Sequence, residues 1–387
     1  MKKILLIIIL LFAFKVHAFD ITSKEVILYN LDNNEVLYEK DANEKTQIAS
    51  LTKIMTAIVT LDNVPDLNKR VIVTKKDLQN IEENNLATAG FTLGEVVSYK
   101  DLLYALLLPS GADAAQILAN NISDDFVSLM NEKAKELKLT NTHFQNPIGL
   151  DNSENYSTAS DVAKMFKYAL KNKEFKEIIQ TSTYTSSNGK IFSSSIFKAS
   201  KKYNIGAPYI LGGKTGTTDG AGLCLASIAK ANDVNYMLIT IGSTYDKKSP
   251  HHLIDSKEIY DYYISNYSNQ IIAKKTDKVY KIKTKYSSEK YYYVTPNEDI
   301  KKYLPNDYNK NDITYKFKGL KEITPFTKEN TKIGKLEVYY QDKLINTQTI
   351  YLNKKIDFSL INFIKENLLI IISVVVIIIL IIKKLVL

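Results

Sequence analysis

The stretch Ile48–Ala57, IASLTKIMTA, places a serine and a lysine three residues apart at the start of an apolar segment. Apolar residues recur at helical spacing over the next dozen positions, at Leu51, Ile54, Met55, Ile58 and Leu61. This spacing predicts a helix that begins near Ser50. Residues at i and i+3 share one helix face, so the amine of Lys53 can reach the hydroxyl of Ser50. An amine among apolar side chains is neutral part of the time and can then take a serine proton.

A Ser-x-x-Lys pair is a weak signal by itself, because the chain contains four more. They are Ser187/Lys190, Ser195/Lys198, Ser227/Lys230 and Ser287/Lys290. We expect these four in polar loops or strands, where residues i and i+3 do not share a face. Ser50 differs because it begins an apolar-faced helix directly after a predicted hairpin. Ser50 and Lys53 are therefore the candidate nucleophile and base.

Two further motifs carry chemistry. Lys214-Thr215-Gly216-Thr217 occurs once, and a lysine and a threonine hydroxyl on a strand can bind the anionic end of a substrate. Gly216 leaves room for a ligand along the strand edge, although a glycine kink beside an exposed lysine is the plainer interpretation. Ser110-Gly111-Ala112 precedes a predicted helix, and taken alone it is better explained as a simple helix cap.

Taken together, the three motifs resemble those of the penicillin-recognising serine acyl-enzymes. Longer stretches across residues 20–265 resemble the low-molecular-weight D-alanyl-D-alanine carboxypeptidases: IASLTKIMTA, LLLPSGADAA, FQNPIGLD, YSTASDVAKM and GGKTGTTDGAG. The resemblance implies a membrane-anchored penicillin-binding protein that removes the terminal D-alanine from peptidoglycan stem peptides ending in D-Ala-D-Ala, which limits cross-linking. It also implies β-lactams as covalent inhibitors and a site that uses no cofactor and no metal.

The resemblance assigns roles to the motif residues. Ser50 would be the acyl-ester nucleophile, Lys53 its general base, and Ser110 the relay that carries a proton to the leaving D-alanine. Lys214 and Thr215 would hold the terminal carboxylate of the substrate.

The backbone N–H groups of Ser50 and Thr217 would form the oxyanion hole. One position departs from the family pattern, because Ala112 stands where an asparagine is usual. Ala112 cannot hydrogen-bond the lysine or the substrate, so positioning must come from elsewhere or the rate is lower.

Two other functions stay open. A class A β-lactamase would need a glutamate to activate water, and Glu154, Glu174 and Glu177 lie in the appropriate interval, but none has an E-x-x-x-N pattern. A low-turnover wall scaffold or β-lactam sensor would explain Ala112, but only Lys383–Leu387 could lie in the cytoplasm to signal. A Ser-His-Asp triad is disfavoured, because His251 and His252 are expected in a polar turn and His143 in a loop.

The pattern of elements predicts an α+β fold with helices packed on an antiparallel sheet. Alternation over Glu25–Tyr29 and Glu35–Glu39 predicts a hairpin, and the region 209–241 predicts three strands joined by turns at 219–220 and 232–233. Four helices are expected besides the one at Ser50: Tyr99–Leu108, 110–120, Thr158–Asn172 and Ser256–Tyr267. The resemblance implies a penicillin-binding, β-lactamase-like sheet with helices on both faces, within a catalytic domain at 19–268.

After residue 270 the sequence predicts a small all-β domain at 270–357, because short period-2 segments alternate with polar turns. The expected strands are Lys278–Lys285, Tyr291–Thr295, Ile313–Phe317, Lys335–Tyr340 and Lys343–Tyr351. A linker at 358–367 then leads to a membrane anchor at 368–387.

The two ends indicate export and attachment to the cytoplasmic membrane. Residues 1–18 have a basic start, an apolar run and a small-residue cleavage site, which predicts a signal peptide. Leu368–Ile382 is apolar on every side apart from Ser373, and Lys383-Lys384 follow, as the positive-inside rule favours for a cytoplasmic end. We therefore expect a single C-terminal span with the body of the protein outside.

The composition excludes several other classes. The formal charge is +9, but five of these charges lie in the two terminal segments and the remaining lysines are mixed with acids, so nucleic-acid binding is not indicated. The single cysteine, Cys224, lies in an apolar run and is expected to be a buried structural residue. No metal-ligand spacing, phosphate loop or dinucleotide fingerprint is present in the sequence.

Overall fold

The computed structural model describes residues 18–79, 81 and 86–386, and the expected signal peptide lies outside this range apart from Ala18. The chain divides into two compact units between Ile264 and Ser265. The first unit contains all three motifs.

A five-stranded antiparallel sheet forms the centre of the first unit, in the order β2-β1-β9-β8-β7. Its strands are β1 (Glu25–Asn30), β2 (Glu35–Lys40), β7 (Ile210–Thr218), β8 (Gly222–Ala231) and β9 (Val234–Ser243). The N-terminal hairpin joins the later strands through β1, in which Glu25 is opposite Ile241 and Asn30 opposite Tyr236 of β9. The strand that carries the Lys-Thr-Gly motif, β7, pairs only with β8 and is an edge of the sheet.

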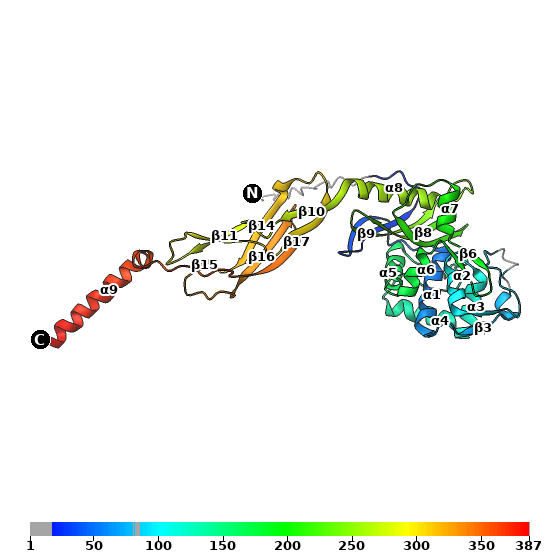
Figure 1. The fold of residues 1–387 in the computed structure, drawn as a ribbon, viewed down its shortest axis with the longest axis horizontal. Helices are drawn as coiled ribbons and strands as arrows, with labels where there is room; N and C mark the ends of the chain where they lie inside the picture. The colour runs from blue at the N-terminus through cyan, green and yellow to red at the C-terminus, as the bar shows by residue number, and fades with distance from the viewer. Residues whose placement is uncertain (1–17, 80, 82–85, 387) are drawn as a thin grey trace, which may run out of the picture. The chain divides into compact units, whose positions relative to one another are not determined.

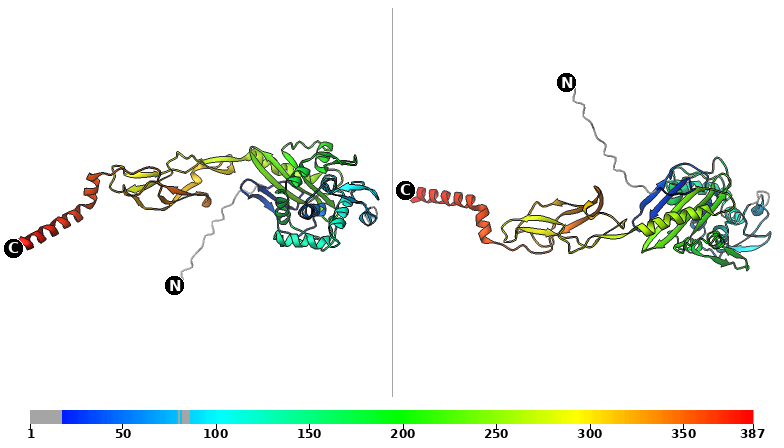
Figure 2. Two further views of the ribbon diagram at one scale, coloured as in Figure 1. Left: turned by 60° about the horizontal axis from the view of Figure 1, so that its bottom comes forward. Right: turned by 90° about the horizontal axis from the view of Figure 1, so that it is seen from above.

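Helices cover both faces of this sheet, as expected (Figures 1 and 2). On one face lies α8 (His251–Asn266), where the hydroxyl of Tyr260 is 3.1 Å from that of Ser227 in β8. The opposite face carries η1 (Ala49–Leu51), α1 (Thr52–Asn63), α2 (Tyr99–Leu107), α3 (Ala112–Ile122), α4 (Phe126–Glu136), α5 (Ala159–Ala169) and α6 (Lys173–Gln180). The helix α7 (Ser195–Lys202) packs beside the edge strand β7. Two small antiparallel two-stranded sheets complete the unit: β3 (Arg70–Ile72) with β4 (Val96–Ser98), and β5 (Thr183–Thr185) with β6 (Ile191–Ser193).

The main core lies between the sheet and α1, the helix that follows Ser50. Ile54, Met55 and Ile58 are buried there against sheet residues such as Ile27 and Ile239. Because α1 is buried over most of its length, the residues at its N-terminus are held in a fixed position relative to the sheet.

Several elements differ from the sequence-based expectation. The closing helix α8 begins at His251, five residues before the expected start, so His251 and His252 lie in a helix and not in a polar turn. Ser195 and Lys198 were expected outside a helix but lie in α7. The segment around Ser195 is rich in serine and lysine, and its helical state depends on burial of Ile196, which the local sequence does not reveal. Helices α4 and α6 were also not predicted.

The second unit contains the expected short strands and three more. One sheet has the order β14-β16-β17, formed by Ile313–Gly319, Lys332–Tyr340 and Lys343–Tyr351. The others pair β11 (Tyr280–Thr284) with β12 (Tyr291–Val294) and β15 (Glu322–Ile323), and β10 (Tyr267–Ala273) with β13 (Ile300–Pro305). Its core contains Tyr292, Val294, Leu336, Val338 and Ile350.

The C-terminal helix α9 runs from Leu360 to Val386 and begins within the segment expected to be a linker. The stretch Leu360–Leu385 is the one helix in the described part of the chain that is long and apolar enough to cross a membrane.

Candidate active site

Ser50 lies in the short turn η1 that leads into α1, and the backbone around it is closely packed. The preceding residue, Ala49, has a left-handed φ of 47°, a strained conformation for a residue with a side chain. A side-chain carbon at Gly149 would lie 2.1 Å from the carbonyl oxygen of Ala49, and one at Gly216 would lie 3.1 Å from the backbone nitrogen of Ser50. Glycine at both positions therefore lets the loop after α4 and the edge strand β7 approach the serine.

Lys53 is buried one turn after Ser50 and faces it. Its Nζ is 3.0 Å from Ser50 Oγ and donates to the carbonyl oxygen of Ile148 at 2.7 Å. Asn146 presents that carbonyl, because its Oδ1 accepts hydrogen bonds from the backbone of Ile148, Gly149 and Leu150 and closes the turn. Burial lowers the pKa of Lys53 to about 7, against an opposing effect of the Asp113 carboxylate. At neutral pH a large fraction of this amine is therefore uncharged.

Ser110 and Lys214 form a second hydroxyl–amine pair. Lys214 Nζ donates to Ser110 Oγ at 2.8 Å and to the carbonyl oxygen of Thr215 at 2.6 Å. Ser110 has a φ of 68°, so both serines lie at a strained backbone position or directly after one. Burial lowers the pKa of Lys214 well below its ordinary value, and the nearby charge of Lys53 lowers it further. Because the charge of Lys53 acts on Lys214, the Ser50–Lys53 pair and the Ser110–Lys214 pair lie in one site.

Thr215 and Thr217 line the free edge of β7. The Oγ1 of Thr215 is 2.6 Å from Ser195 Oγ at the start of α7. Thr217 is exposed, and its hydroxyl donates to the carbonyl oxygen of Gly216 at 2.8 Å. The edge strand thus offers hydroxyl groups beside the buried Lys214.

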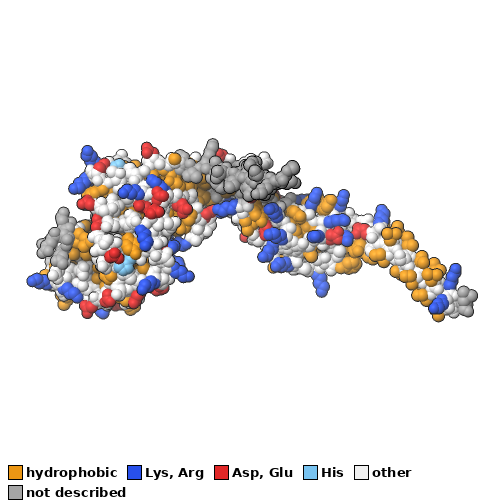
Figure 3. Space-filling model, turned by 180° about the vertical axis from the view of Figure 1, so that it is seen from behind, with side chains coloured by type: hydrophobic (Ala, Val, Ile, Leu, Met, Phe, Trp, Pro, Cys, Tyr) orange, Lys and Arg blue, Asp and Glu red, His pale blue; other side chains and the backbone are white. Residues whose placement is uncertain are grey.

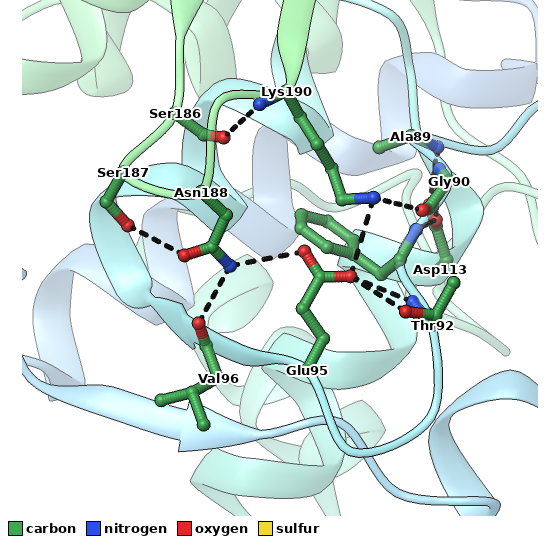
Figure 4. Close-up of polar contacts among 11 residues, drawn as sticks. Ala89, Gly90, Thr92, Glu95, Val96, Asp113, Ser186, Ser187, Asn188 and Lys190 are labelled. Carbon is green, nitrogen blue, oxygen red and sulfur yellow. Dashed lines mark hydrogen bonds and ion pairs between the residues drawn. The ribbon is translucent and has the colours of Figure 1, made fainter.

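Asp113 fixes the loop beside Ser110 from within (Figure 4). Its buried carboxylate accepts hydrogen bonds from the backbone N–H groups of Ala89, Gly90, Phe91 and Ala114. The same loop is tied from outside to the β5–β6 turn. There Lys190 donates to the carbonyl oxygen of Gly90 at 2.7 Å, and Asn188 donates to Glu95 at 3.2 Å and to the carbonyl oxygen of Val96 at 2.9 Å (Figure 4).

We expect Asp113→Ala to destabilise the protein by about 3 kcal/mol, because several buried N–H groups would lose their acceptor. Thermal unfolding measures this change. Lys190→Met is the matched control, since it removes an outer contact to the same loop and should cost less than about 1 kcal/mol. Asp113→Asn adds a second readout: losing the charge lowers the pKa of Lys53 further, so the acidic limb of the activity profile moves to lower pH. An unchanged melting temperature in Asp113→Ala would contradict this role.

Sequence reasoning missed three contributors: the carbonyl of Ile148, the carboxylate of Asp113 and the hydroxyl of Ser195. Asp113 directly follows the Ser110-Gly111-Ala112 motif, and Ile148 lies in the quoted stretch FQNPIGLD, so both were adjacent to recognised signals. Ser195 gave only a Ser-x-x-Lys pattern, which was set aside. Cys224 is fully buried in β8, as expected.

Comparison with known proteins identifies the family of this chain. A family model described as D-alanyl-D-alanine carboxypeptidase matches residues 12–244, which is more than half of the chain. The chain belongs to this family. Its members are serine peptidases and low-molecular-weight penicillin-binding proteins.

Individual relatives of this carboxypeptidase family extend the match. The D-alanyl-D-alanine carboxypeptidase DacF of Bacillus subtilis is 29% identical over 326 residues, covering 81% of this chain and 80% of that protein. The crystal structure of the Streptomyces K15 DD-transpeptidase superposes with a TM-score of 0.57 at 29% identity, covering 64% of this chain and 98% of the other. A D-alanyl-D-alanine carboxypeptidase from Mycobacterium tuberculosis gives a TM-score of 0.58 at 29% identity, with 65% and 94% covered.

Proposed function

We propose that this protein is a serine D-alanyl-D-alanine carboxypeptidase that releases the terminal D-alanine from peptidoglycan stem peptides through an acyl-enzyme on Ser50. The observation that carries the proposal is the pairing of Ser50 Oγ with the buried amine of Lys53 at 3.0 Å. A serine hydroxyl is a weak nucleophile until a neighbouring base removes its proton. Neutral Lys53 is such a base, because burial lowers the pKa of its amine to about 7.

In the acylation step, Lys53 takes the Ser50 proton while Oγ attacks the carbonyl carbon of the penultimate D-alanine. The ester bond forms, the peptide C–N bond breaks, and a proton passes through Ser110 to the amine of the departing D-alanine. Water then attacks the ester carbonyl carbon, the bond from this carbon to Ser50 Oγ breaks, and the shortened peptide leaves with a new terminal carboxylate. A proton from the water returns through the same groups to Ser50 Oγ. The backbone N–H groups of Ser50 and Thr217 bind the oxyanion, and one such donor contributes about 3 kcal/mol.

Lys214 and Thr215 bind the terminal carboxylate of the substrate. In the free site the charge on Lys214 is disfavoured by burial and by Lys53. A bound carboxylate supplies the missing counter-charge and raises the pKa of Lys214 again. β-Lactams carry a carboxylate in the same relation to a reactive carbonyl, and they acylate Ser50 as covalent inhibitors.

For the domain boundaries we propose those predicted from the sequence: a catalytic domain at 19–268, a β domain at 270–357, a linker at 358–367 and an anchor at 368–387. The catalytic domain lies on the extracytoplasmic side, and α9 attaches it to the cytoplasmic membrane. Support for the attachment comes from the length and apolar composition of Leu360–Leu385. Lys383 and Lys384 at the far end of the helix favour a cytoplasmic C-terminus.

The test is D-alanine release from a pentapeptide that ends in D-Ala-D-Ala, by the purified full-length chain. We expect one D-alanine to be released from each pentapeptide, and we expect penicillin to form a long-lived adduct. Rapid hydrolysis of nitrocefin without peptide cleavage would favour a β-lactamase instead. Against that alternative, Glu154 and Glu177 are exposed, and Glu174 is only half-buried.

Ala112 gives a further expected result. It is buried at the start of α3, next to the motif serine. Ala112→Asn would supply the amide that is usual at this position of the family pattern, and one hydrogen bond of about 1 kcal/mol corresponds to a roughly fivefold gain in kcat/KM. Ala112→Val is the control, since it fills the same space without a polar atom and should lower the rate. No gain in the asparagine variant would mean that the Ile148 carbonyl already does this positioning.

A further inference from the structure

Within the second unit, an aromatic cluster lies where the β strands meet α9. Phe326 and Phe358 have ring centroids 6.2 Å apart, and Phe358 and Phe363 lie 5.7 Å apart. Tyr286 closes the cluster, 5.0 Å from Phe363 and 6.4 Å from Phe326. Phe326 is 69% exposed and Phe358 50% exposed, so the cluster presents an apolar surface to its surroundings. Grouped exposed aromatics of this kind mark an interaction surface.

Hydrogen bonds fix the backbone segments that carry the rings of the cluster. Phe326 projects from a tight turn in which the backbone N–H of Thr327 donates to the carbonyl oxygen of Thr324 at 3.0 Å. The start of α9 is bonded to the loop at the other side: the Ser359 N–H donates to the carbonyl oxygen of Tyr286 at 2.8 Å. Asn362 Nδ2 donates to the carbonyl oxygen of Ser287 at 2.7 Å. The aromatic rings are therefore held beside the first turn of α9.

The distance along α9 places this cluster at the depth of the lipid headgroups. The apolar run begins at Leu368, five residues after Phe363. Five helical residues rise about 7.5 Å. The interfacial layer on each side of the hydrocarbon core is about 5–7 Å thick. When Leu368 enters the core, Phe363 lies at the outer edge of that layer, where amphipathic and aromatic side chains are favoured.

The charge of the second unit is a second, independent indication that this unit lies close to a membrane surface. Residues 265–357 contain 19 lysines against 11 aspartates and glutamates, whereas residues 19–264 contain 26 basic against 30 acidic residues. The unit next to the apolar helix is therefore strongly basic, and the catalytic unit is slightly acidic. Figure 3 shows lysines across the surface of this unit and apolar side chains along α9. Lys321, Lys328 and Lys355 near the aromatic cluster are exposed. Basic groups near a bilayer surface are attracted to anionic headgroups.

We propose that the aromatic cluster and its neighbouring lysines form a membrane-docking surface that rests in the headgroup layer of an anionic phospholipid bilayer. The proposal rests on the membrane attachment through α9 proposed above. Its consequence is that the second unit is held against the bilayer at a second point and does not swing freely on the helix.

Tryptophan scanning tests this directly, because the chain contains no tryptophan. Single variants of the full-length protein are reconstituted in vesicles whose acyl chains carry bromine quenchers near the headgroup. Phe326→Trp reports on the docking surface. Leu344→Trp is the matched control, since it is 50% exposed and lies at the opposite end of β17 from α9. Ile372→Trp reports on insertion of α9 itself.

We expect Phe326→Trp to show a blue shift and loss of emission in phosphatidylglycerol-containing vesicles, and a smaller loss in pure phosphatidylcholine. Leu344→Trp should show neither. Quenching of Ile372→Trp with unquenched Phe326→Trp would overturn the docking surface alone, whereas unquenched Ile372→Trp would overturn the attachment as well. A blue shift of Phe326→Trp without lipid quenching would mean that a second copy of the chain covers it, and would also overturn the proposal.

Discussion

Ser50→Ala removes the covalent adduct with labelled penicillin and lowers D-alanine release by about 10⁴-fold or more, as loss of an acylating serine does in other hydrolases. The fold should persist, because Ser50 is only partly buried and its hydroxyl accepts a hydrogen bond from the neighbouring Lys53 within the same turn. Mass spectrometry of the adduct and thermal unfolding of the same sample measure both outcomes.

Ser195→Ala provides the sharpest control for this result. Ser195 belongs to the other Ser-x-x-Lys pair that lies in a helix, and it contacts Thr215 of the site. The lysine of its own pair, Lys198, is exposed, so this pair lacks the buried amine that Ser50 has in Lys53. The adduct in this variant should still map to Ser50. An adduct that survives Ser50→Ala and disappears with Ser195→Ala would reassign the nucleophile.

Lys53→Met should lower acylation about 10³-fold, within the range that general-base catalysis contributes. In the parent protein acylation should rise with pH through about 7, because the amine must lose its proton to act and burial lowers its pKa to that value. The methionine variant should lose this acidic limb. A stopped-flow pH profile of penicillin acylation compares the two. A limb that persists in Lys53→Met would assign the titration to another group.

The pH dependence of stability gives an independent measure of the lowered pKa of Lys53. The folded-state pKa of Lys53 lies below its ordinary value of 10.5, so the unfolded chain binds the proton more tightly and the amine opposes folding increasingly as the pH falls from about 10 to 7. The stability of Lys53→Met relative to the parent should therefore increase over this interval and stay constant below it. Urea unfolding at several pH values measures the difference.

Local signals in the sequence determined much of this protein. Alternating apolar residues predicted the β1–β2 hairpin and the β7–β9 strands, because side chains on a strand face opposite sides in turn. Helical spacing predicted α1 and placed Lys53 beside Ser50, because residues three apart share a helix face. These predictions succeeded because each depends on neighbours within a few residues.

The tertiary structure decided what surrounds those groups. Lys53 finds its acceptor in Ile148, 95 residues away, and Lys214 finds Ser110 at a separation of 104 residues. The helical state of α7 depends on burial of Ile196, and the role of Asp113 depends on the loop at Ala89 folding over it. Such contacts, and the burial that lowers the pKa of both lysines, exist only when distant segments pack together. The sequence thus named the candidate nucleophile and its candidate base, whereas only the packed fold created the dry environment that lowers the pKa of that lysine.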